Sequence, residues 1–143
     1  MKKLITVAVP VFNEKANIEP LYTRTKTVCE TLTAYAYEIV FFDDGSTDGT
    51  REEIQALCAA DDHVKAVFYA RNFGYSKNIF YAMQQAKGDC AILLHADLQN
   101  PPELIPVFIE KWEAGAQIVQ GVKTQSRENT LMYFLRTVFY WMM

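Results

Sequence analysis

A polar cluster follows a short apolar run in the segment CAILLHADLQNPPEL, residues 90–104, where His95, Asp97 and Gln99 occupy every second position. Alternate residues of an extended segment project to the same side, so these three side chains could converge on one cation. Mg²⁺ and Mn²⁺ favour oxygen ligands and often share them with substrate phosphates. The spacing therefore suggests a metal that bridges the protein and a diphosphate.

The same segment also has a purely structural interpretation. His95 could simply be the last residue of a strand, and Asn100 could cap a helix that starts at the prolines of residues 101–102. The residues that surround this segment in the fold decide between the two interpretations.

Short apolar runs alternate with helical patterns along the chain. The expected strands are residues 4–9, 37–42, 64–69, 90–95 and 117–121, and the expected helices are 17–33, 47–60, 75–87 and 101–114. Strands that are apolar on both faces and separated by helices predict a mostly parallel sheet with helices on both faces. We expect one α/β domain of the Rossmann-like kind.

In such a domain the ligand lies outside the carboxyl ends of the strands. Four segments should meet there: PVFNE (10–14), DDGSTDGT (43–50), ARNFG (70–74) and HADLQNPPE (95–103). The chain has no GxGxxG or GxxxxGK[ST] pattern, so no glycine loop would hold phosphates through backbone N–H groups. A diphosphate would therefore need a cation.

The second of these segments holds several carboxylates with competing interpretations. Ser46 and Asp48 are as well suited to capping the next helix as to binding a ligand. A second carboxylate at the strand end, from the pair Asp43 and Asp44, is better placed to accept hydrogen bonds from a ligand.

Composition limits the classes of function. The chain has 143 residues, of which half are hydrophobic and 22% charged, and its net charge is -3. This composition is globular, and it gives no long-range attraction to nucleic acid. The cysteines Cys29, Cys58 and Cys90 are far apart and form no zinc pattern, so we expect reduced thiols and a cytosolic location.

The segments VAVPVFNE, VFFDDGSTDGT, ARNFG and HADLQNPPE, in this order, resemble the nucleotide-sugar domain of family 2 glycosyltransferases with the GT-A fold. The RNFG and ADLQ.PPE variants are similar to the polyprenyl-phosphate branch, which includes dolichyl-phosphate mannose synthases and bactoprenol glucosyltransferases. The resemblance covers roughly residues 4–127. It implies inverting transfer of a sugar from a UDP- or GDP-sugar donor to a lipid phosphate, assisted by Mn²⁺ or Mg²⁺.

The resemblance also implies roles for individual residues near the donor. Those that would contact the nucleotide are Pro10, Phe12, Glu14, Asp44 and Ala96. Asp44 matches the acid that contacts the base.

The implied metal positions are His95, Asp97 and Gln99, and the implied catalytic residues are Asp97 and Lys123, which would stabilise the departing diphosphate. No general base is implied, because a phosphate acceptor is already an anion near neutral pH. The chain departs from the family pattern at two positions: His95 replaces an aspartate, and Asn100 replaces the aspartate of LQDPPE. An imidazole at the first position suits Mn²⁺ better than Mg²⁺.

The C-terminal stretch of residues 128–143 is rich in aromatic residues and methionine. Its apolar part is about half of the ~20 residues that span a bilayer. It would form either a core helix of the domain (residues 1–127) or an interfacial helix leading to a membrane region. An exposed helix of this kind would favour membrane contact or a homo-oligomer. We therefore expect a protein at the cytoplasmic face of a membrane.

A second function from a different class stays open. The histidine at the first metal position and the short chain are also compatible with a non-catalytic module that binds nucleotide-sugars. A nucleotidyltransferase is a poorer match, because the VPVFNEKAN segment lacks a glycine-rich loop with arginine and lysine.

Overall fold

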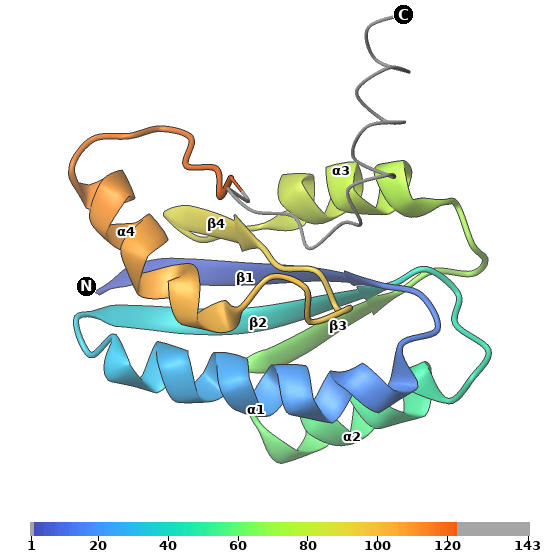
Figure 1. Cartoon of the computed structure of the whole chain (residues 1–143). Helices are drawn as coiled ribbons and strands as arrows, with labels where there is room; N and C mark the ends of the chain where they lie inside the picture. The colour runs from blue at the N-terminus through green and yellow to red at the C-terminus, as the bar shows by residue number, and fades with distance from the viewer. Residues whose placement is uncertain (1, 123–143) are drawn as a thin grey trace, which may run out of the picture.

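The computed structural model describes residues 2–122 as one α/β layer structure (Figure 1). Four parallel strands form one sheet in the order β3-β2-β1-β4. The strands are β1 (Lys3–Val11), β2 (Tyr35–Asp43), β3 (Val64–Phe68) and β4 (Cys90–Leu93). The helices are α1 (Lys15–Thr31), α2 (Thr50–Ala60), α3 (Tyr75–Gln85) and α4 (Ile105–Glu113), with a 3₁₀ turn, η1 (Pro102–Leu104), before α4. The predicted parallel α/β architecture is confirmed.

The expected strand at residues 117–121 is wrong. No described residue there is in a strand, and in the described part of the chain β4 pairs only with β1. Ile118 is 90% exposed, so its side chain does not pack against the core as a strand residue of a covered sheet would. An alternating apolar pattern favours an extended chain, but a ladder also needs a partner strand in register. β4 itself ends at Leu93, two residues earlier than expected, because a turn follows it.

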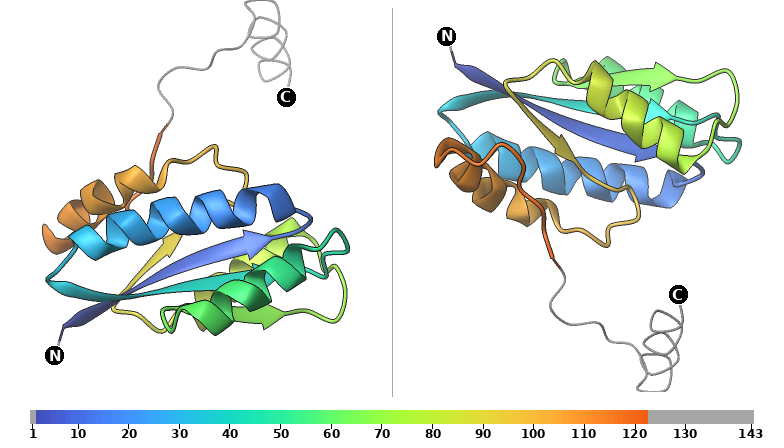
Figure 2. Two further views of the ribbon diagram at one scale, coloured as in Figure 1. Left: turned by 90° about the horizontal axis from the view of Figure 1, so that it is seen from below. Right: turned by 90° about the horizontal axis from the view of Figure 1, so that it is seen from above.

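The two faces of the sheet are covered unequally. Figure 2 shows α1 and α2 on one side of the sheet and α3 on the other. The larger hydrophobic core lies on the α1 side and includes the alternate β1 residues Ile5, Val7 and Val9, together with residues of α1, α2 and α4. The core beneath α3 is much smaller and centres on Ala8, Phe42 and Ala82.

Polar side chains cross the sheet on the α3 side. The Thr6 hydroxyl and Lys65 Nζ each donate to the Glu38 carboxylate, at 2.6 Å in both cases. Burial alone would raise the pKa of Glu38, but these two donors outweigh burial and hold the pKa below its usual value. Gly88 belongs to the same hydrogen-bond network, since its N–H donates to Thr6 Oγ1 at 3.0 Å.

The chain's three cysteines all lie in the described part and are free thiols. Burial raises the pKa of Cys29 to about 11, which keeps this thiol protonated at neutral pH. In the same part of the chain, no helix has both the length and the apolar character needed to cross a membrane.

Substitution of Gly88 tests this packing. A Cβ at position 88 would lie 2.6 Å from the Leu4 carbonyl oxygen and 2.8 Å from Thr6 N and Oγ1. We expect Gly88→Ala to lower the free energy of unfolding by about 1–3 kcal/mol, as overpacking does in other cores. The control is Gly121→Ala, whose new Cβ would meet only the ring of Phe108, at 3.3 Å. Equal unfolding free energies for the two variants in urea titrations would contradict this packing.

Candidate functional site

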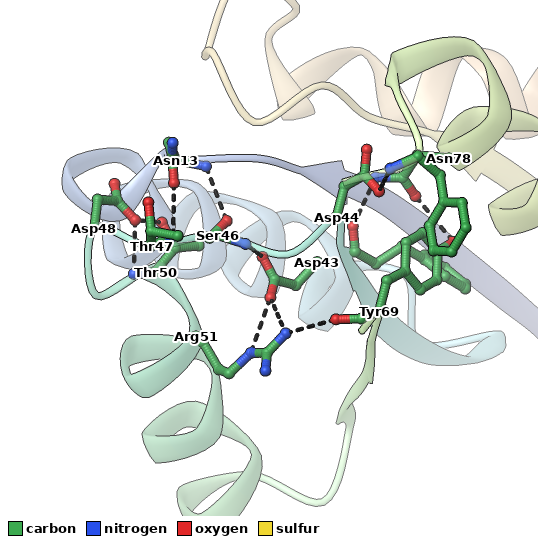
Figure 3. Close-up of polar contacts among 12 residues, drawn as sticks. Asn13, Asp43, Asp44, Ser46, Thr47, Asp48, Thr50, Arg51, Tyr69 and Asn78 are labelled. Atoms are coloured by element: carbon green, nitrogen blue, oxygen red, sulfur yellow. Dashed lines mark hydrogen bonds and ion pairs between the residues drawn. The ribbon is translucent and has the colours of Figure 1, made fainter. Parts of the chain in front are cut away.

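The loops after β1 and β2 are joined by hydrogen bonds at the carboxyl edge of the sheet (Figure 3). The Asn13 N–H donates to Ser46 Oγ, and the Thr47 N–H donates to Asn13 Oδ1, both at 2.9 Å. Asn13 adopts a positive φ of 54°, a conformation that asparagine tolerates better than most residues. Ser46 therefore links two loops, which the capping interpretation did not anticipate.

Asp48 holds the starts of two helices. Its Oδ1 accepts a hydrogen bond from the Thr50 N–H at 3.0 Å, and its Oδ2 accepts one from the Lys15 N–H at 3.2 Å. Thr50 Oγ1 in turn accepts from the Glu14 N–H at 3.0 Å. Burial would raise the pKa of Asp48, but the hydrogen bonds that it accepts lower the pKa overall. Asp48 thus accepts hydrogen bonds from the first N–H groups of both α1 and α2.

Asp43 is fully buried and forms an ion pair with Arg51 of α2, at 3.0 Å between Oδ2 and Nη2. The same guanidinium nitrogen donates to the Tyr69 carbonyl oxygen at 2.9 Å, and the Ser46 N–H donates to Asp43 Oδ1 at 3.1 Å. Every part of this arrangement is internal to the protein, so the role of Asp43 is structural. Arg51 could not be identified from the sequence, because nothing in its spacing assigns it a partner.

Asp44 ties the loop after β2 to the loop after β3. Its carboxylate accepts hydrogen bonds from the backbone N–H groups of Phe73 at 2.8 Å and Gly74 at 2.9 Å, and the residue is only 2% exposed. The loops touch at Gly45, where an added Cβ would lie 2.8 Å from the Arg71 carbonyl carbon. Asp44 therefore has a structural role that no local sequence pattern indicates, while its contact with a nucleobase stays a prediction.

The residues expected to contact the nucleotide come from neighbouring strands. The Asp44 N–H donates to the Val11 carbonyl oxygen at 2.9 Å, so this residue lies beside the end of β1. Pro10 is buried in β1, Phe12 just beyond it is 44% exposed, and Glu14 accepts a 2.6 Å hydrogen bond from the Asn17 side chain. Beyond β4, the Leu94 N–H donates to the Ala8 carbonyl oxygen at 3.0 Å. This bond holds the segment after β4 beside the end of β1, and the buried Ala96 follows two residues later.

The expectation that residues 95, 97 and 99 project to one side of an extended segment is wrong. A turn occupies residues 96–97, and Leu98 has a positive φ of 58°. The Gln99 N–H donates to Asp97 Oδ1 at 3.0 Å, so the aspartate side chain mimics a backbone turn. The alternation of an extended strand is therefore lost between residues 95 and 99.

His95 faces α3. The Tyr75 hydroxyl lies 3.2 Å from His95 Nδ1, and the two rings stack at 5.7 Å between centroids, 28° from parallel. This contact connects the loop after β4 to the start of α3. The imidazole is half-buried, whereas Asp97 and Gln99 are exposed at the surface.

The donor set fits a metal that is shared with a substrate, and does not fit one enclosed by protein. Within residues 2–122 no three His, Cys, Asp or Glu side chains are grouped so that they could hold a metal ion. Asp97 supplies one exposed carboxylate, which is typical of Mg²⁺ sites that take their other ligands from phosphates and water. Lys123 and the stretch 128–143 lie outside the described residues.

A cleft of about 550 Å³ extends the edge of the site. It lies among β4, α4 and residues 116–122, and both His95 and Gln99 line it. The walls nearest α4 are apolar, with Phe108 and Trp112 among the lining side chains. The polar edge of the sheet thus continues into a mainly apolar groove.

The family model described as glycosyl transferase family 2 matches residues 6–143, which include all four loops. The chain is 44% identical over 115 residues to a prophage bactoprenol glucosyl transferase homolog of Escherichia coli strain K12, covering 80% of this chain and 37% of that protein. It is 40% identical over 127 residues to an undecaprenyl-phosphate 4-deoxy-4-formamido-L-arabinose transferase of Pseudomonas paraeruginosa, covering 88% and 37%. The chain spans just over a third of the length of these relatives.

Among solved structures, a mannosyltransferase from Pyrobaculum calidifontis in complex with GDP-Man and Mn²⁺ superposes with a TM-score of 0.68. The match covers 95% of this chain and 39% of that protein at 22% sequence identity, so it supports the fold alone. The GT-A fold expected from the sequence is confirmed. Because the family model covers nearly the whole chain, this protein belongs to glycosyl transferase family 2.

Proposed function

We propose that this chain is the donor-binding region of a glycosyltransferase that transfers a sugar from a UDP- or GDP-sugar to a polyprenyl phosphate. The observation that carries the proposal is the 44% and 40% identity to proteins named as bactoprenol and undecaprenyl-phosphate transferases. The hydrogen-bonded loops at the carboxyl edge of the sheet also support the proposal, because ligands of such α/β domains bind at this edge.

The proposed reaction is a single inverting displacement. A phosphate oxygen of the acceptor forms a bond to the anomeric carbon, the bond from that carbon to the diphosphate breaks, and the electron pair leaves with the nucleoside diphosphate. The attacking oxygen is already anionic, so no side chain needs to remove a proton. Asp97 and Gln99 would orient the diphosphate at the loop after β4, and Lys123 would offset its growing charge. A divalent ion held by Asp97 would supply electrophilic stabilisation of the leaving group.

The donor nucleotide would lie over the end of β1. Phe12 is the exposed aromatic surface there, Asp44 would receive a base N–H on a lone pair not used by the loop, and Pro10, Glu14 and Ala96 would line the same edge. The acceptor would approach from the membrane, because a polyprenyl chain is a lipid. The protein would therefore act at the cytoplasmic face of a membrane, where nucleotide-sugars are available.

A non-catalytic module that binds nucleotide-sugars is the second candidate. Two observations favour it: His95 stands where the family pattern has an aspartate, and its ring stacks on Tyr75. Asp97 is then the only carboxylate between β4 and η1 that could hold a cation.

Two measurements on the purified chain separate the candidates. Calorimetry with UDP, GDP, UDP-glucose and GDP-mannose, each with and without Mn²⁺, measures donor binding. Incubation of radiolabelled donors with undecaprenyl phosphate measures transfer to lipid. Binding accompanied by labelled lipid supports the transferase. Binding without labelled lipid favours the module, and no binding of any donor contradicts both.

The first prediction concerns Asp97. We expect Asp97→Ala to weaken Mn²⁺-dependent binding of the nucleoside diphosphate by about 1.5–3 kcal/mol, since a contact to a charged group is lost. The control is Asp62→Ala, which removes an exposed carboxylate from the loop before β3, at the opposite end of the sheet. Calorimetry should show no change for the control, and equal affinities of Asp97→Ala and the unaltered chain would remove Asp97 from the metal site.

The second prediction concerns His95. If the imidazole contributes to the metal site, His95→Asp should tighten Mg²⁺-dependent nucleotide binding and narrow the gap between Mg²⁺ and Mn²⁺, because a carboxylate suits Mg²⁺ better. Tyr75→Phe is the matched control, because it removes the hydroxyl contact to His95 and keeps the imidazole. If His95→Asp and Tyr75→Phe leave the metal preference unchanged, His95 is only a structural partner of Tyr75.

The third prediction concerns Asp44. Asp44→Asn leaves one of two backbone N–H groups facing an amide NH₂, so we expect the free energy of unfolding to fall by about 1–3 kcal/mol. Nucleoside binding, measured where the variant is still folded, should also weaken. Unchanged nucleoside affinity together with lower stability would leave Asp44 a purely structural role.

A further inference from the structure

The outer surface of α3 is unusual for a helix that packs on a sheet. Within the described residues α3 is the only helix on its side of the sheet, as Figures 1 and 2 show. Its inner side is buried through Asn78 and Ala82. A helix in this position normally presents polar and charged residues to solvent.

Large apolar side chains gather on and beside this helix instead. Of the ten large hydrophobic side chains that are at least 40% exposed in the described part of the chain, five lie in residues 73–83. Phe80 is 66% exposed, and the helical period places it opposite the buried Asn78 and Ala82. Met83 is 40% exposed on the flank of the helix, where it also lines the cleft beside β4. Tyr75 and Phe73 extend the apolar surface at the start of the helix.

The same segment is cationic in an acidic protein. Residues 70–88 contain Arg71, Lys77 and Lys87 and no aspartate or glutamate, whereas the whole chain has a net charge of -3. All three cationic side chains are exposed. Lys77 lies three residues before Phe80 within α3, so the helical period places it near the exposed ring, and Lys87 follows two residues after the end of α3. We call the set Phe73, Tyr75, Lys77, Phe80, Met83 and Lys87 the α3 face.

We propose that the α3 face docks on an anionic lipid surface, with its aromatic side chains at the headgroup level and its lysines on the phosphates. Exposed aromatic residues flanked by lysine are the pattern of helices that lie in a membrane interface. A buried protein interface, in contrast, is depleted in lysine. The acidic remainder of the chain would be repelled by anionic lipid, so the charge asymmetry also orients the molecule.

This docking deepens the proposed function and rests on it for its biological purpose. Tyr75 belongs to the α3 face and also contacts His95 in the loop that carries Asp97. A bilayer against α3 would therefore lie beside the loop where the sugar leaves its diphosphate. A lipid phosphate could then reach that loop while its polyprenyl chain stays in the bilayer.

The experiment measures binding of the full 143-residue chain to vesicles by flotation. Vesicles of phosphatidylcholine alone are compared with vesicles that also contain phosphatidylglycerol, at low and high salt. They contain no polyprenyl phosphate and no nucleotide-sugar, so a failed transfer reaction would not affect the result. The test variant is Lys77→Glu/Phe80→Ser/Lys87→Glu. The matched control is Lys2→Glu/Val107→Ser/Lys111→Glu, which makes the same changes at exposed sites away from α3.

We expect the unaltered chain to bind anionic vesicles more tightly than neutral ones, and less tightly as salt rises. Loss of each lysine should cost roughly fivefold in affinity for the anionic vesicles, so the α3 variant should bind at least about 25-fold more weakly. The control should keep most of the affinity. Urea titrations of both variants establish that they are folded.

Three results would overturn the proposal. The first is equal vesicle affinity for the α3 variant and the control. The second is a loss of binding in Phe134→Ser/Phe139→Ser with no loss in the α3 variant, which would assign docking to the C-terminal stretch. The third is a dimer, detected by light scattering, that the α3 variant dissociates without altering vesicle binding; the α3 face would then be a contact between copies.

Discussion

The carboxyl edge of the sheet depends on two adjacent buried carboxylates, Asp43 and Asp44, at the end of β2. Consecutive residues at the end of a strand project to opposite sides, and Figure 3 shows the two side chains diverging. Asp43 meets the guanidinium of Arg51, while Asp44 meets two backbone N–H groups of the loop after β3. Removing a carboxylate from water is costly unless it is paired. Asp43 therefore keeps α2 in contact with the end of β2, and Asp44 keeps the loop after β3 in contact with it.

This constraint makes the four loops unequal. The loops after β1, β2 and β3 are joined to one another through Asn13, Asp44 and Asp48, so they keep one geometry without a ligand. The loop after β4 has a local bond between Gln99 and Asp97, and it reaches the rest of the edge through His95 on Tyr75. If the donor binds at these three loops as proposed, their fixed geometry would reduce the ordering cost of binding. The segment expected to hold a metal contacts the start of α3 through His95.

The sequence indicated the fold well and the site less well, for a physical reason. Buried strands and amphipathic helices leave a periodic signal, which is why four of five strands and all four helices were predicted close to their actual bounds. The segment 117–121 has the same signal without a partner strand, and residues 95–99 alternate in sequence but turn in space. The pair of Asp43 with Arg51 and the bridge from Asn13 to Ser46 join separate elements, so no local pattern reveals them.

The same contacts indicate where a cation would act if a nucleoside diphosphate binds at this edge. A nucleoside diphosphate brings two or more negative charges to an edge that already holds Asp43, Asp44 and Asp97. The charge of Asp43 is balanced by Arg51, and that of Asp44 is stabilised by two backbone N–H dipoles. Asp97 is exposed, and one of its oxygens, Oδ1, accepts the hydrogen bond from the Gln99 N–H. It is the carboxylate of the three whose repulsion of a diphosphate is least offset by the protein. A divalent ion between Asp97 and the diphosphate would turn this repulsion into attraction, so donor binding and metal binding should be coupled at this residue.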